Sequence, residues 1–574
     1  MEKTYNLVEL FSGIGSQAKA LKNLGIAVNL QGTSEWDVHA IAAYDVIHNN
    51  PEIPSEIQNM SKEQMLEELN NYTFSNSGKA PMDSRQLRSY SEDALRRIYT
   101  SVVRNKNFVD VTRLNGASLP NGIDILTYSF PCQDLSNVGA FHGYTKGIDK
   151  DSGSRSSLLW QVGRILTEMK SAQKTLPRFL LLENVPTLLS PRHFENFQTW
   201  ISDLENLGYV SHYYQLNASA FGLPQNRPRL LMISVYVGNN YNKWRLVRDY
   251  FEKKKDAASI VSDYRNSRFF TQYTVPQLLR TNYSNKKIMA EAIECTPNDT
   301  ESRRKIWEDN PQIILSDGSF NTSIDVIRTI TTKQDRNPNS GNLFFESGIE
   351  GRSKFRYLTP RECLLFMGFS DDDYKQLKYH NVEFHKGDKL FARDKVIRMA
   401  GNSIPVKLLE GIFYQILQID DILNTLQDCF TDKESHICQT PSELIRSYLF
   451  KNGIRSRVSS HDDIPTNATV VYPKYKTAIY VWRNFCGGRP NDGEDCRLCA
   501  DSYWKKRCGQ TSIISQLDAS EALSKGWNVI SVKFCELNKN SQQETLSWIL
   551  RCVKSGIASE SCGKVFTQDH KPMI

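Results

Sequence analysis

The sequence lacks any apolar run long enough to cross a membrane, which takes about 20 residues. It also lacks the basic start and apolar core of a secretory signal, because a strand-like segment begins already at Asn6. This short start leaves no room for an N-terminal helix-turn-helix module. These absences predict a cytoplasmic protein with no membrane partner.

Cysteine is scarce over most of the chain: three of the 12 cysteines precede residue 429, and nine follow from there on. Because cytosolic thiols stay reduced, this asymmetry favours a metal site over disulfides. Cys496 and Cys499 form a Cys-x-x-Cys pair, which suits tetrahedral structural zinc. The predicted third and fourth ligands are Cys508 and Cys535, with Cys486 as an alternative; scattered thiols without metal are the competing interpretation.

The length and net charge of the chain limit its domain number and its possible partners only broadly. A chain of 574 residues is expected to hold more than one domain. Its net charge of +7 is compatible with binding to a polyanion without requiring one. The function must therefore be sought in local motifs.

A glycine turn opens the chain's first α/β unit. The strand over 6–11 ends in Ser12-Gly13-Ile14-Gly15-Ser16, and a helix follows. Such a turn brings backbone close to a nucleotide-like ligand, although the third glycine of the dinucleotide motif is missing. The next strand ends at Glu35 and Trp36, which suit a ribose and a purine ring; a surface acid and a core tryptophan are the alternative.

The segment Ser129-Phe130-Pro131-Cys132 follows an apolar strand over 124–128. Pro131 ends that strand and fixes the backbone, so Cys132 is expected at the carboxyl end of a strand, where open α/β sheets place ligands. A lone cysteine is more often inert packing. Further motifs argue against that alternative.

Three more segments carry polar residues beside apolar strands. Glu183 ends the run Leu180-Leu181-Leu182, so desolvation is expected to raise its pKa. Arg227 and Arg229 occupy alternate positions before the strand over 230–233 and would offer donors to one side. A turn over 400–406 contains Asn402 and Ser403 and precedes a helix.

Taken together and in this order, the motifs resemble those of the DNA (cytosine-5)-methyltransferases. The resemblance covers residues 1–425 and rests on Phe-x-Gly-x-Gly, Pro-Cys-Gln, Glu-Asn-Val, Gln-x-Arg-x-Arg and Gly-Asn-Ser. Arg361 and Glu362 match a further motif, and 328–333 resembles a threonine-containing turn beside the target base. The implied fold class is α/β: a Rossmann-like sheet that binds S-adenosylmethionine, with an inserted target-recognition domain.

The resemblance also implies roles for individual residues. Cys132 would attack C6 of a flipped-out cytosine, Glu183 would face N3, Arg229 would hold O2, and Arg227 would support Cys132 or a phosphate. The implied contacts of S-adenosylmethionine are Phe11, Gly13, Gly15, Glu35, Trp36, Asp110, Asn402 and Ser403.

The implied setting is a prokaryotic or phage-infected cell. The expected partner is double-stranded DNA, with a cognate restriction endonuclease possible, and the protein is expected to be a monomer. A tRNA cytosine methyltransferase and a DNA-binding regulator with vestigial catalysis are the competing classes.

Composition along the chain predicts three regions. A catalytic domain over 1–234, with an insertion over 38–109, is completed by 395–425. Residues 235–394 lose the α/β alternation and are assigned to target recognition. The insertion contains a helical pattern over 61–66 and has no readable role, so a solvated surface segment is expected.

Residues 432–574 form a third region. It contains Gly453-Ile454-Arg455-Ser456-Arg457-Val458, Phe485 after the second expected strand, Gly526-Trp527 before the third and Cys535 at the end of the third. With these residues the region weakly resembles the very short patch repair endonuclease. It is expected to be a small α/β, restriction-endonuclease-like domain with a helix over 441–450 and strands near 470–472, 478–482 and 529–532. Thr469 or a neighbouring residue stands where that family has its metal-binding aspartate, and Trp482 stands near its histidine position. We therefore expect a nuclease-like fold without its chemistry; a fused methyltransferase and mismatch-nicking enzyme is the alternative.

Overall fold

The computed structural model describes residues 3–49, 51–131, 156–429, 441–455, 468–482, 520–533, 537, 542–556 and 559–560. The chain divides into two compact units. Unit 1 comprises Met1–Leu204, His212–Tyr236 and Asp256–Asp421, and unit 2 comprises Glu205–Ser211, Val237–Lys255 and Ile422–Ile574.

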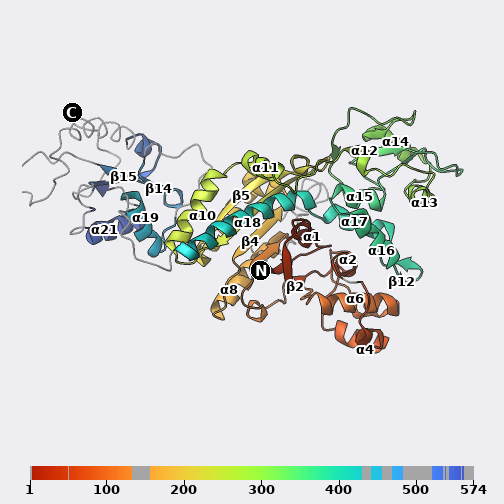
Figure 1. Cartoon of the computed structure of the whole chain (residues 1–574), viewed down its shortest axis with the longest axis horizontal. Coiled ribbons are helices and arrows are strands. Elements are labelled where there is room, and N and C mark those ends of the chain that lie inside the picture. Colours follow the sequence, from red (N-terminus) through yellow and green to blue (C-terminus); the bar gives the residue numbers. More distant parts are fainter. Residues whose placement is uncertain are drawn as a thin grey trace, which may run out of the picture. The chain divides into compact units, whose positions relative to one another are not determined.

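The centre of unit 1 is a six-stranded sheet (Figure 1). Its strand order is β2-β1-β3-β4-β7-β5. Its strands are β1 (Thr4–Leu10), β2 (Ala27–Ser34), β3 (Ile125–Tyr128), β4 (Phe179–Asn184), β5 (Tyr209–Asn217) and β7 (Pro228–Tyr236). Every residue of β3 and β4 is buried, so both faces of the sheet are covered. This arrangement confirms the predicted α/β, Rossmann-like methyltransferase fold class.

Strand order reverses between β1 and β3, which pair in parallel with Leu10 opposite Tyr128. The carboxyl ends of these two strands form the switch point where open α/β sheets bind ligands. Strand β7 runs antiparallel to β4, with Leu230 opposite Asn184. The start of β7 therefore lies at the same sheet edge as the end of β4.

Helices precede and follow these strands in the usual alternation. They include α1 (Ser16–Asn23), α2 (Val38–His48), α8 (Leu159–Ser171), α9 (Pro191–Leu207) and α18 (Val406–Cys429). The predicted insertion forms α2, α3 (Ser55–Gln58), α4 (Lys62–Leu69), α5 (Ser84–Arg88) and α6 (Glu92–Arg104). Ser61 begins α4 with a capping box to Gln64, which confirms the helical pattern there.

The region between β7 and α18 is built from short elements. Its helices within unit 1 are α11 (Ala257–Arg265), α12 (Val275–Leu278), α13 (Lys286–Glu294), α14 (Glu301–Asp309), α15 (Pro360–Phe366), α16 (Asp371–Tyr379) and α17 (Arg393–Asn402). A small sheet joins β8 (Gln312–Ile314), β10 (Asn342–Phe344) and β11 (Phe355–Arg356); β6 (Gln225–Asn226) pairs with β9 (Ile327–Arg328), and β12 (Glu383–His385) with β13 (Asp388–Lys389). These short elements agree with the weak periodicity of the sequence.

Unit 2 contains a four-stranded mixed sheet in the order β14-β15-β16-β17. Its elements are α10 (Tyr241–Lys253), α19 (Pro441–Lys451), β14 (Val470–Tyr472), β15 (Thr477–Trp482), β16 (Asn528–Lys533), α21 (Gln542–Ser555) and β17 (Ser559–Glu560). The predicted helix and three strands are present. The likeness to the repair endonuclease remains a prediction.

Helix α10 belongs to unit 2, although the sequence analysis assigned its residues to target recognition. Trp244 is 1% exposed and its ring lies 5.2 Å from that of Phe450 in α19. Arg455 stacks on Phe450 and donates to the backbone oxygen of Gly238 at 3.1 Å. The structure thus groups mid-chain residues with the C-terminal part of the chain.

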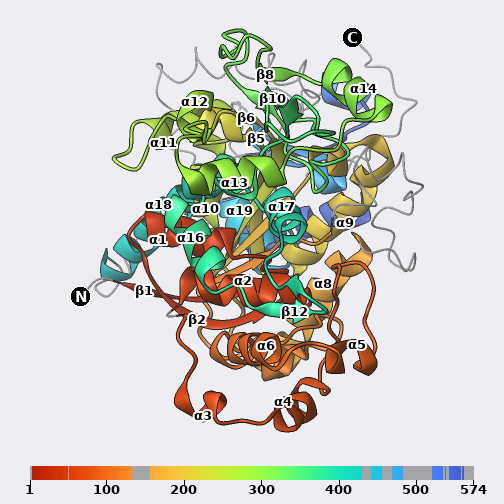
Figure 2. The same cartoon turned by 90° about the vertical axis from the view of Figure 1, so that its right-hand side faces the viewer.

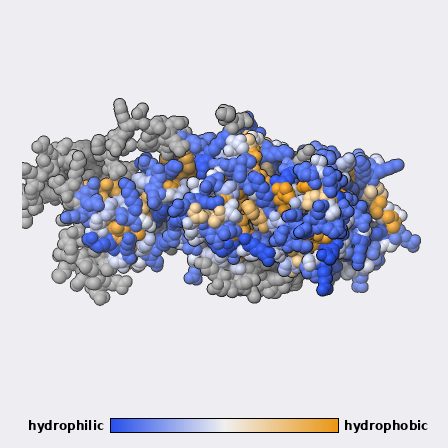
Figure 3. All heavy atoms as spheres, turned by 90° about the horizontal axis from the view of Figure 1, so that it is seen from below, coloured by the Kyte–Doolittle hydropathy of each residue, from blue (hydrophilic) through white to orange (hydrophobic). Residues whose placement is uncertain are grey.

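Exposed apolar side chains are scattered among hydrophilic ones on the face shown in Figure 3. Among the described residues, no helix combines the length and apolarity that crossing a membrane would require.

Candidate active site

The glycine turn after β1 is fixed to the end of β2. Phe11 adopts a left-handed conformation (φ 59°), and the N–H groups of Phe11 and Ser12 donate to Ser34 O at 2.7 and 3.2 Å. At Gly15 (φ 77°) a Cβ would lie 2.3 Å from Nε2 of His48, so only glycine fits. At Gly13 (φ 54°) a Cβ would meet no atom within 4 Å, so the turn has open space in front of it.

Glu35 orients its carboxylate toward this turn. Its oxygens accept N–H groups from Gly13 at 2.9 Å, Trp36 at 2.9 Å and Asp37 at 2.8 Å. Burial raises the pKa of Glu35 to about 7, with Asp37 adding to the effect and the N–H bonds opposing it. A fixed carboxylate beside an open glycine turn offers an acceptor for the hydroxyl groups of a ligand.

Two other predicted cofactor contacts are partly exposed. Trp36 is half-buried directly after Glu35. Asp110 is also half-buried, and its carboxylate accepts the N–H and hydroxyl of Thr112 at 2.9 and 2.7 Å. Both residues keep surface available for a ligand such as the adenine ring.

Cys132 lies outside the described residues, but the turn that leads into it is described. Asn184, at the end of β4, donates from Nδ2 to the backbone oxygen of Phe130 at 3.0 Å. Ser156 donates to the backbone oxygen of Pro131 at 2.6 Å. The end of β4 is thus joined to the residues immediately before the predicted nucleophile.

Glu183 and Arg229 meet at this sheet edge. Arg229 Nε lies 2.9 Å from Glu183 Oε1, and each side chain is nearly buried. Burial raises the pKa of Glu183, while the positive charges of Arg229 and Arg227 oppose the rise. The predicted direction of this shift is confirmed. The antiparallel pairing of β7 with β4 is what brings these residues together.

Arg227 joins three segments that are distant in the sequence. It is 2% exposed and donates to backbone oxygens of Ile330 at 3.1 Å and of Gly401 and Ser403 at 2.8 Å. A Cβ at Gly401 would lie 2.8 Å from the backbone of Thr331, so the two turns are in close contact. The predicted contact with Cys132 involves an undescribed residue and stays a prediction.

The predicted cofactor contacts Asn402 and Ser403 differ in their surroundings. Asn402 is exposed. Ser403 is buried, and its hydroxyl donates to the backbone oxygen of Met399 at 2.8 Å. The cofactor role of these two residues stays a prediction.

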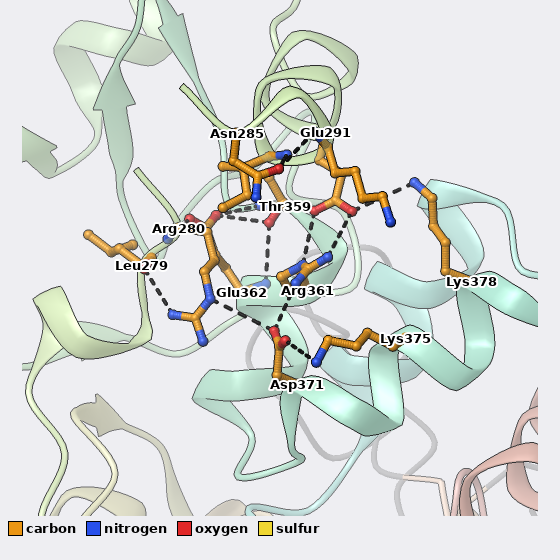
Figure 4. Close-up of polar contacts among 12 residues, drawn as sticks. Leu279, Arg280, Asn285, Glu291, Thr359, Arg361, Glu362, Asp371, Lys375 and Lys378 are labelled. Carbon is orange, nitrogen blue, oxygen red and sulfur yellow. Dashed lines mark hydrogen bonds and ion pairs between the residues drawn. The ribbon is translucent and has the colours of Figure 1, made fainter. Parts of the chain in front are cut away.

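Arg361 and Glu362 of α15 make polar contacts with neighbouring elements (Figure 4). Arg361 pairs with Glu291 of α13 at 3.1 Å and with Asp371 of α16 at 2.9 Å. The buried Glu362 accepts the N–H of Arg280 at 2.8 Å. The motif found in the sequence therefore fixes α13 and the segment before it against α15 and α16.

The predicted zinc ligands Cys496, Cys499, Cys508 and Cys535 all lie outside the described residues, as does the alternative Cys486. Within the described part of the chain, no group of three or more His, Cys, Asp or Glu residues is placed to hold a metal ion.

Sequence reasoning missed two residues that hold the Glu35 loop. Asn107 donates to Glu35 O and accepts from Glu35 N, each at 3.0 Å. Arg398 of α17 pairs with Asp37 at 2.7 Å. Neither residue belongs to one of the family motifs, so no signal in the sequence marks either of them.

Comparisons with known proteins show which family the sequence resembles. A family model described as C-5 cytosine-specific DNA methylase matches residues 86–418. The chain is 31% identical over 418 residues to the orphan methyltransferase M.SssI of Spiroplasma monobiae, covering 72% of this chain and 97% of that protein. It is 29% identical over 416 residues to the type II methyltransferase M2.ScrFI of Lactococcus lactis subsp. cremoris, covering 71% and 98%. The crystal structure of S. pombe Dnmt2 methyltransferase aligns with a TM-score of 0.43 at 15% identity, covering 72% of this chain and 99% of that one.

Proposed function

Because this chain belongs to the C-5 cytosine-specific DNA methylases, we propose that it methylates C5 of a flipped-out cytosine within a specific duplex sequence. The observation that carries this proposal is the Glu183–Arg229 pair, 2.9 Å apart, at the sheet edge where Asn184 holds the turn before Cys132. A nucleophile, a carboxyl group and a guanidinium would then converge on one base.

The chemistry assigns each of these groups a task. Cytosine C5 is a weak nucleophile, so a thiolate of Cys132 would add at C6 and push electron density toward C5 and N3. Glu183 would hydrogen-bond N3, and its raised pKa favours the protonated form that this task requires. Arg229 would leave its pair with Glu183 and hold O2 of the base.

The family uses S-adenosylmethionine, which supplies the methyl group. In this chain Phe11, Gly13 and Gly15 would face it, Glu35 would bind its ribose, and its adenine would lie between Trp36 and Asp110. Asn402 and Ser403 would complete the site. The open turn at Gly13 and the fixed carboxylate of Glu35 support this assignment.

Double-stranded DNA is the proposed partner, and a restriction–modification or solitary role is the proposed setting. The relatives above carry the names type II and orphan methyltransferase, which supports this setting. We further propose that the chain acts as a monomer. A cognate endonuclease acting on the same site would accompany it in the first setting.

The C-terminal region is proposed to be a nuclease-like domain without nuclease chemistry, held by zinc. Thr469, at the position of the expected aspartate, accepts the N–H of Val481 with its hydroxyl oxygen at 2.9 Å. A hydroxyl engaged by the neighbouring strand is a poor substitute for a magnesium-binding carboxylate.

Bisulfite sequencing of DNA from expressing cells tests the proposal directly. We expect 5-methylcytosine at one sequence motif, and none with Cys132→Ser. Duplexes carrying 5-fluorocytosine should trap a covalent adduct with the wild-type protein only. Methylation of tRNA but not of duplex DNA by the purified protein would favour the competing class.

A further inference from the structure

We propose that the insertion over 38–109 positions the cofactor-binding loop Glu35–Trp36–Asp37, with Asn107 as its main positioning residue. This inference rests on the proposed use of S-adenosylmethionine. The sequence alone gives the insertion no role beyond a solvated surface segment.

Asn107 joins the end of β2 to the turn that precedes Asp110. It is 5% exposed, its Oδ1 accepts N–H groups from Glu35 and Val109 at 3.0 Å each, and its Nδ2 donates to Glu35 O at 3.0 Å. The amide of Asn107 supplies both the acceptor and the donor that this pattern needs. The two loops that would contact ribose and adenine therefore share one side chain.

The turn that Asn107 holds has an unfavourable backbone. Val109 has a φ of 61°, a left-handed conformation that a β-branched residue rarely adopts. Its N–H is bound by Asn107, and its carbonyl accepts the hydroxyl of Ser34 at 3.1 Å. Such conformations persist where surrounding contacts impose them and often occur at binding sites. Here they set the position of Asp110.

The middle of the insertion holds the same loop from another direction. Ser75 N donates to Trp36 O at 2.8 Å, and Ser75 O accepts the N–H of Val38 at 3.0 Å. Arg398 of α17 pairs with Asp37 and also donates to the backbone oxygen of Asn76 at 3.2 Å. Three consecutive loop residues are thus each fixed by a separate contact, two of which come from the insertion.

The placement of the insertion in the fold fits this role. Strand β2 is an edge strand of the sheet, and Figure 2 shows α3, α4 and α6 lying beyond it. Thr33 and Asn107 form an isolated parallel bridge, so the returning chain continues the sheet next to the end of β2. A solvated surface insertion would not require polar contacts directed at this one loop.

The test compares Asn107→Ala with a matched variant, Asn105→Ala. Asn105, directly after α6, is also buried, but its amide group donates to Ser101 of α6, to the backbone oxygen at 3.0 Å and the hydroxyl at 3.1 Å. Titration calorimetry would measure the dissociation constant of S-adenosylmethionine without DNA, and thermal unfolding would report stability. We expect both variants to lower Tm.

Only Asn107→Ala should weaken cofactor binding, by about tenfold or more, as expected from the loss of hydrogen bonds worth about 1 kcal/mol each. It should raise KM for S-adenosylmethionine while leaving kcat at saturation nearly unchanged. Should Asn107→Ala fold poorly, Asn107→Ser keeps an acceptor and should bind with intermediate affinity.

Unchanged affinity in both Asn107 variants, or equal weakening by Asn105→Ala, would show that Asn107 serves stability alone and would overturn the inference. Absence of binding by the wild-type protein is a different result. It would overturn the proposed function, and the positioning role with it.

Discussion

Glu9 makes the stability of this protein depend on pH. The residue is fully buried in β1, and its carboxylate accepts the N–H of Ala18 at 3.2 Å and the hydroxyl of Tyr44. Burial raises its pKa from 4.5 to about 7, although these two bonds oppose the rise. Glu9 is therefore expected to be protonated in the folded protein below neutral pH.

The sign and size of the effect follow from the difference between the folded and unfolded states. The folded pKa lies above the unfolded one, so the stabilising contribution is fully present below about pH 4.5 and is lost as pH rises through about 7. The slope within this window is about −1.4 kcal/mol per pH unit. Between about pH 5 and pH 8, Glu9 alone would lower the free energy of unfolding by roughly 2.5 kcal/mol.

Glu9→Gln isolates this contribution. The glutamine carbonyl can accept from Ala18, and its amide can donate to Tyr44, so it imitates the protonated acid. Urea unfolding across the same pH range should show a shallower pH dependence for the variant than for the wild type, by about one proton. Glu35, whose pKa is also raised to about 7, should account for part of the remaining slope. Equal slopes in wild type and Glu9→Gln would refute the reasoning.

Four further predictions concern the site and the C-terminal region. Glu183→Gln should lower kcat by roughly 10²–10⁴-fold while leaving S-adenosylmethionine affinity nearly unchanged. Glu291→Gln, which breaks another buried ion pair, is the control. A defect confined to cofactor binding would show that Glu183 does not act in the active site. Gly401→Ala should lower stability by about 1–3 kcal/mol and reduce turnover, because the new methyl would press on the backbone of Thr331; an unchanged Tm in thermal unfolding would contradict this close contact. Elemental analysis should find about one zinc per chain, and this zinc should be lost in Cys496→Ser. The protein should not nick T·G mismatched DNA in the presence of magnesium. A nick that survives Cys132→Ser would instead show that the protein is a fused methyltransferase and nuclease.

The sequence was sufficient to predict the positions of candidate site residues that lie at the ends of strands. Glu183 ends an apolar run and Arg229 starts another, so the residue pattern alone predicts that both lie at a sheet edge. Their direct pairing could not be predicted, because it requires β7 to run antiparallel to β4, and residue patterns do not specify strand direction.

Contacts between loops were beyond sequence reasoning. No periodicity or motif marks Asn107. Its hydrogen bonds depend on two backbone segments that only the fold brings together. The grouping of α10 with unit 2 was missed for a related reason. An amphipathic pattern predicts that a helix packs against another element, but it does not identify that element.

The aromatic contact between α10 and α19 has a consequence for biosynthesis. Trp244 leaves the ribosome roughly 200 residues before Phe450, which at bacterial synthesis rates is a delay of about 10–40 s. During that interval the rings of Tyr241 and Trp244 in α10 have no partner from α19 to cover them. Nascent chains are then open to aggregation or chaperone capture at α10, and slowing translation between the two helices would prolong that exposure.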